Sequence, residues 1–164
     1  MSSQNISEPE GQFLMDLYNK ATTASKKGDY DTAIGLLDEC LSKSPKPELA
    51  VLAYWNLAVT ILMKFNFQER KGEDVSDGEM KWCQRMLICA KRVRGIYDSH
   101  LKNHPTYRDS NYAIYQQANN LYKAYTFYGS VYRNNFGSLS QRSMKNIANA
   151  YAKPLRCIAN EEGA

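Results

Sequence analysis

The sequence predicts an all-α protein of about six helices. Apolar residues recur at spacings of three and four through most of the 164 residues, whereas the alternation typical of strands is nearly absent. Glycine and proline separate these periodic segments. With 43% hydrophobic and 23% charged residues, the composition is that of a globular protein. We expect a flexible polar tail over residues 1–12 and one helical domain over residues 13–160.

The first two helices are the most clearly marked. Residues 13–24 place their apolar side chains on one face of a helix, and Gly28 is expected to end it, because glycine reaches a left-handed conformation without a Cβ clash. A second helix is predicted over residues 30–43. Pro45 and Pro47 then stop it, since proline lacks the amide hydrogen and clashes with the preceding turn.

This helical pair resembles one tetratricopeptide repeat. Residues 14–47 span the 34 residues of such a repeat, and bulky, small and turn residues stand at its signature positions. The matching residues are Leu17, Ala21, Gly28, Tyr30, Ala33, Leu37, Cys40 and Pro45. The resemblance implies antiparallel helix pairs stacked as a short right-handed superhelix, and it implies protein binding rather than catalysis.

Two further pairs are expected after the first repeat. Residues 51–105 form a second repeat with a polar inserted loop at 64–76, followed by a helix that a Ser76 and Glu79 capping box starts. Residues 107–160 form a degenerate third pair that caps the array, with a long helix over 108–132 and a last helix whose stripe spans 144–158.

Nothing in the sequence predicts an enzyme, a cofactor or a metal site. No glycine-rich phosphate loop or nucleophile elbow is present. His100 and His104 have metal-ligand spacing on a helix, but His104 precedes Pro105 and is biased away from helical geometry. No cysteines form a C-x-x-C pair, and we expect them to be reduced and mostly buried. They are Cys40, Cys83, Cys89 and Cys157.

A cytoplasmic location is expected. Residues 1–12 lack the basic start and apolar run of a secretory signal. The longest apolar stretch, residues 49–63, is shorter than the roughly 20 residues of a membrane span, so none is predicted.

Charge is distributed unevenly along the chain. Residues 1–50 carry 5 Lys and Arg against 8 Asp and Glu, whereas residues 51–106 carry 9 against 6 and residues 107–164 carry 7 against 3. The net charge of +4 is too small to imply nucleic acid, but the asymmetry could orient the domain toward an acidic partner surface.

The family register places a hydrophobic groove along the first and third helices. We predict that a partner helix or extended segment binds there, so that the chain acts as an adaptor, scaffold or complex subunit. The predicted contact residues are Tyr18, Thr22, Leu52, Trp55, Asn56, Val59 and Leu62, with Met15 and Met63 beside them. The carboxylate clamp of chaperone-binding repeats is not expected, since Asn56 fits that pattern but Tyr18 and Thr22 do not.

Two arrangements are possible for this apolar face. Residues 107–160 could fold back over it, which gives a monomer, or the face could stay open for a partner or a second copy. The wide apolar arc of residues 114–131 favours fold-back and a monomer over a homodimer.

Nucleic-acid binding is the alternative function. Lys81, Arg85 and Arg92 share one helix face and could bind an anion, and Lys91 and Arg94 lie close by in the same basic cluster. Seven tyrosines between residues 107 and 132 could stack on bases. A solvated helix face for the cations and a core position for most of the tyrosines are the favoured explanations, so protein binding remains the main prediction.

Overall fold

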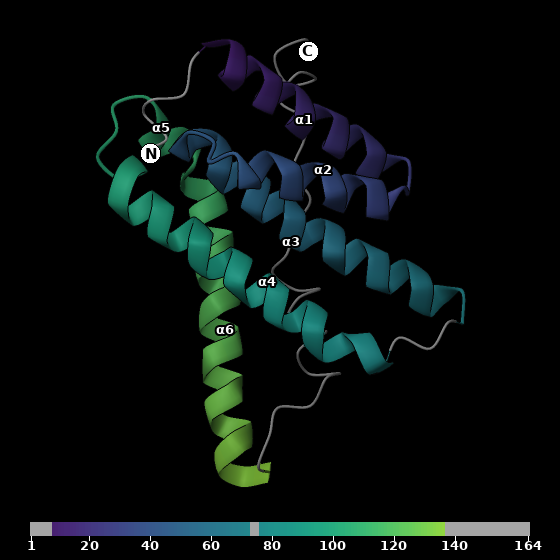
Figure 1. Cartoon of the computed structure of the whole chain (residues 1–164). Helices are drawn as coiled ribbons and strands as arrows, with labels where there is room; N and C mark the ends of the chain where they lie inside the picture. The colour runs from purple at the N-terminus through teal and green to yellow at the C-terminus, as the bar shows by residue number, and fades with distance from the viewer. Residues whose placement is uncertain (1–7, 73–75, 137–164) are drawn as a thin grey trace.

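The computed structural model describes residues 8–72 and 76–136, with side-chain surroundings for residues 9–68, 71–72 and 84–124. These residues are helical throughout their length, apart from short turns, and contain no strand (Figure 1). The all-α prediction is therefore confirmed. Residues 1–7 of the predicted tail and the predicted last helix lie outside the described residues.

The first helical pair is α1 (Glu8–Lys26) and α2 (Tyr30–Ser42). The prediction of a tail up to residue 12 is wrong for residues 8–12, which form the first turns of α1. Acidic residues are favourable near a helix N-terminus, where the helix dipole is positive, and Glu8 and Glu10 stand there.

Gly28 makes the turn between these helices, as predicted. Its φ of +84° is left-handed, and its N–H donates to the Ser25 carbonyl at 3.0 Å. The Asp29 N–H donates to the Ala24 carbonyl at 2.9 Å. These two bonds form a Schellman motif, which satisfies carbonyls left free at the end of α1.

α3 (Pro47–Arg70) is longer than predicted. Pro47 opens it at a position where the missing N–H has no cost. The predicted loop at 64–76 is wrong up to Arg70, because the charged run packs against the start of α2. The Lys64 ammonium lies 2.7 Å from the Asp31 carboxylate, and the Phe67 ring meets Tyr30 edge-on at 5.8 Å between centroids.

The second half begins with α4 (Ser76–Ile96), which starts where the capping box was expected and continues as a π-helical turn, η2 (Tyr97–Leu101). The predicted helix 108–132 is divided at Asn111 into α5 (Tyr107–Ser110) and α6 (Tyr112–Phe136). Asn111 is buried, and its side-chain amide donates to the Tyr107 carbonyl at 3.2 Å. This side-chain bond offers the backbone an alternative to a continuous helix.

The helices pack mainly on their neighbours in the chain. α1 packs on α2, α2 on α3, α3 on α4, and α4 on α6, with smaller contacts from α3 to α1, α6 and η2. Figure 1 shows α1 to α4 following one another in a slanted stack, while α6 runs steeply across its end. One core cluster joins these helices, with Trp55, Tyr18 and Leu37 among its largest fully buried side chains.

α3 contains a long apolar segment. Its segment Pro47–Gln68 is long and apolar enough to cross a membrane by length and composition. In the structure, 67% of an apolar 18-residue stretch within this segment is buried in the protein, as in the central helix of a folded domain.

We predict opposite effects from two glycine substitutions on the stability of the fold. Gly28→Ala should lower the free energy of unfolding by about 1–2 kcal/mol, because a Cβ is strained at a left-handed φ. Gly35→Ala should raise it by about 0.5–1 kcal/mol, because Gly35 is helical and a Cβ there meets nothing within 4 Å. Urea denaturation of both variants measures the difference, and equal shifts would contradict the assignment of the turn.

Candidate functional site

The residues predicted to line the groove lie inside the protein. Tyr18 and Trp55 are 0% exposed, and Leu52 is half-buried. Thr22, Asn56, Val59 and Leu62 are also buried. Most of these side chains belong to the core cluster that joins α1 and α3 to the other helices. The groove is therefore not an open trough in this structure, and the prediction that these side chains face a partner is not supported by their positions.

Residues 107–160 were predicted to fold back over that face, and the structure describes them only to residue 136. In this part, α6 adds Ile114, Ala118 and Leu121 to the core. It packs mainly on α4 and makes only a small contact with α3.

The described residues of the predicted basic cluster have different surroundings. Arg85 donates to both carboxylate oxygens of Asp38 on α2, at 3.0 and 3.2 Å. The Arg94 guanidinium lies over the Tyr122 ring of α6, 4.1 Å from its centroid. Arg92 is exposed, and the side chain of Lys81 lies outside the described surroundings. Arg85 of the predicted anion site is thus paired with Asp38 and joins two helices.

The tyrosines at the start of α6 pack on one another. The rings of Tyr97 and Tyr115 are stacked at 4.5 Å between centroids, and Tyr112 lies 6.1 Å from Tyr115. Tyr97 is buried, and its hydroxyl donates to the Arg108 carbonyl at 2.8 Å. Tyr112 keeps 47% of its surface exposed. These rings act mainly as packing between η2 and α6, and the side chains of Tyr125, Tyr128 and Tyr132 lie outside the described surroundings.

Metal and nucleophile chemistry find little support in the part that the structure describes. No group of three or more His, Cys, Asp and Glu side chains there could hold a metal ion. The Nδ1 of His104 accepts from the backbone N–H groups of Thr106 and Tyr107, at 3.0 and 3.1 Å, so it holds the turn before α5. Cys40 and Cys89 are free and buried, as expected of the cysteines.

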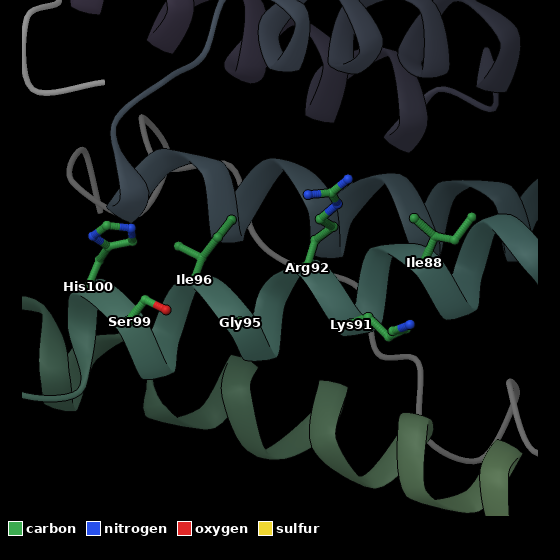
Figure 2. A pocket seen from close by; sticks show the side chains of 7 residues that line it. All are labelled: Ile88, Lys91, Arg92, Gly95, Ile96, Ser99 and His100. Carbon is green, nitrogen blue, oxygen red and sulfur yellow. The ribbon is translucent and has the colours of Figure 1, made fainter. Parts of the chain in front are cut away.

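A shallow hollow of about 630 Å³ lies on the outer side of α4. Seven residues line it, and we call them the α4 face: Ile88, Lys91, Arg92, Gly95, Ile96, Ser99 and His100. Figure 2 shows Ile88, Arg92, Ile96 and His100 pointing to one side of the helix, with no side chain at Gly95 between them. Ile88 is 53% exposed, which is unusual for a large aliphatic side chain in this protein.

Most of the α4 face points away from the side by which α4 joins the core, whereas Ile96 at its edge is half-buried and packs against the core cluster. Met86, Ala90 and Val93 are buried, whereas Ile88, Lys91 and Arg92 on the other side are exposed. The steps from Ile88 to Arg92, Gly95 and Ser99 are four, three and four residues, the spacing of a stripe by which one helix packs on another.

Of the residues on this face, the sequence indicated Lys91 and Arg92 as members of a basic cluster and His100 as one of two histidines with metal-ligand spacing. The other signals were Ile88, which stands outside the apolar stripe of its helix, and Gly95, a glycine inside a helix with no turn to make. Each signal is weak by itself, and only the structure shows that the two residues lie together.

Comparison with known proteins adds no relative. No family model, curated protein or solved structure matches this chain.

The burial of Trp55 predicts a fluorescence result. In a Trp82→Phe variant, emission from Trp55 should be blue-shifted from that of the urea-unfolded chain and resist quenching by acrylamide, because the indole is excluded from water. The comparison of quenching before and after unfolding is the measurement. Efficient quenching of Trp55 emission by acrylamide in the folded chain would show that the indole is accessible to solvent, as the predicted open groove requires.

The buried thiols predict a loss of stability at alkaline pH. Burial raises the pKa of Cys89 to about 12, and burial together with the Glu39 charge raises the pKa of Cys40 to about 11. The unfolded chain releases these protons near the ordinary thiol pKa of about 8.5, whereas the folded chain retains them. The stabilisation is therefore complete below that pH and is lost as pH rises toward 11 and 12.

The measurement is the free energy of unfolding in urea between about pH 8 and pH 10. It should fall less steeply in a Cys40→Ala, Cys89→Ala double variant than in the natural chain. Identical slopes would show that these thiols do not titrate differently on unfolding.

Proposed function

We propose that this chain is a non-catalytic protein-binding module that docks a segment of a partner on the α4 face. The observation that carries the proposal is the exposed Ile88, which lines a hollow together with Gly95. Exposed apolar surface beside a concavity is typical of a protein-binding site.

The proposed architecture is that of a short tetratricopeptide-like array. Consecutive helices pack on one another from α1 to α4 and then on α6, and the Gly28 turn matches the turn of such a repeat. α1 and α3 would be the first helices of two repeats, and α2 and α4 the second helices. The salt bridge between Arg85 and Asp38 then connects the two second helices, at 3.0 Å. We propose that the outer side of this array binds, because the inner side is buried.

Gly95 is the feature of the α4 face that the fold does not require. It lies within a helix, its φ is not left-handed, and a Cβ there would meet nothing within 4 Å. A glycine at such a position costs about 1 kcal/mol of stability relative to alanine. The absence of a side chain would be useful if the backbone of a partner approaches closely at this point.

Nucleic-acid binding is less well supported than protein binding. Arg85 and Arg94 are engaged with Asp38 and Tyr122, so fewer cations are free for a phosphate backbone than the sequence suggests.

A pair of matched glycine variants tests the proposal. Gly95→Gln should abolish or strongly reduce partner capture from the native cell, because the new side chain fills the hollow. Gly35→Gln places the same side chain on the exposed surface of α2 and should leave capture unchanged. Both variants should be slightly more stable than the natural chain, since glutamine is the better helix former.

The measurement is affinity capture with quantitative mass spectrometry, beside thermal denaturation of each variant. Loss of the same captured protein in Gly95→Gln but not in Gly35→Gln supports the α4 face. Equal capture by all three folded chains would exclude it.

A further inference from the structure

We infer that the segment docked on the α4 face is an acidic amphipathic helix of a partner protein. This inference rests on the proposed function and adds the chemistry of the partner. It follows from the charges on the face, from the spacing of its apolar residues and from the side chains it lacks.

The charges on the α4 face have one sign. Lys91 and Arg92 are exposed, and neither makes an ion pair with another residue in the described part of the chain. None of the seven lining residues is acidic. Asp98 is exposed on the same helical segment but does not line the hollow. Carboxylates on the partner would complement this surface and would speed association through long-range attraction.

The apolar residues of the face have the spacing of a helix contact. Ile88 and Ile96 are eight residues apart, which places them about 12 Å apart along the same side of α4. Gly95 and Ser99 are four residues apart, and their small size permits close approach of a second helix between the larger side chains. A partner helix with apolar residues two turns apart could therefore contact both isoleucines at once.

Other peptide conformations fit this face less well. An extended segment usually binds by joining a sheet edge, and the described residues contain no strand. A proline-rich segment binds grooves lined by Tyr, Trp and Phe rings, and none of these residues is among the seven that line this hollow. The acidic helix is the mode that uses both the isoleucines and the cations.

A displayed library of helical peptides, randomised on one face, tests the inference with the full chain as bait. The natural chain should enrich peptides with Asp and Glu beside an apolar stripe. A Lys91→Glu, Arg92→Glu double variant should enrich peptides with Lys and Arg instead, because the charge of the face is reversed. Lys20→Glu, on an exposed position of α1, is the control and should enrich the same peptides as the natural chain.

Binding constants of an enriched peptide give the second readout. Its affinity should fall by about tenfold or more in the double variant and should weaken with salt, as expected when charge pairs contribute. Ile88→Ser should also weaken binding, whereas a contact made by charges alone would be insensitive to it.

The outcomes separate this inference from the proposed function. Enriched peptides that are basic or rich in proline, yet lose binding in Gly95→Gln, would overturn the acidic helix and retain the α4 face. Peptides that bind equally to every α4 variant would overturn both. If no peptide is enriched, the acidic helix is overturned. The capture experiment with Gly95→Gln then still tests the α4 face. Concentration-dependent self-association in sedimentation, lost in the double variant, would replace the partner helix with a second copy.

Discussion

The constraint on which the structure depends is that α3 must be covered on nearly every side. Between residues 49 and 62 only Leu52 and Tyr54 are not fully buried, so the helix has almost no face that can meet water. α2 and α4 provide most of the cover, and α1, η2 and α6 make smaller contacts. Truncation of a residue as large as Trp55 in such a core typically costs about 3–5 kcal/mol. The other helices are arranged around this requirement.

The location of the proposed site follows from this arrangement. With α3 enclosed, the groove that repeat proteins commonly expose has no free apolar surface here. α4 packs on α3 and α6 and is tied to α2 by Arg85, so one side of it remains outside the core. The exposed Ile88 and the hollow at Gly95 lie on that side. The packing that covers α3 thus leaves one side of α4 exposed, and we propose that a partner binds there.

Local signals in the sequence predicted most of the helices but little of the site. Gly28 marked its turn correctly because a left-handed position has few alternatives to glycine. The loop at 64–70 was predicted wrongly because charge along the chain does not reveal that Lys64 and Phe67 contact α2. The break at Asn111 depends on a side-chain bond that helical periodicity does not encode. The sequence also does not reveal the contact partners of Arg85 and Tyr97, since these depend on tertiary packing.

Native-state hydrogen exchange tests the enclosure of α3 most directly. If α3 is covered as described, amides of residues 49–62 should be the slowest in the chain and should exchange only through global unfolding, with the free energy that urea denaturation gives. Amides on the exposed side of α4 and η2, such as those of Lys91, Arg92 and Ser99, should exchange faster through local opening. If the amides of residues 49–62 exchanged at a much lower free energy than that of global unfolding, the cover over α3 would open locally. That result would contradict the enclosure of α3.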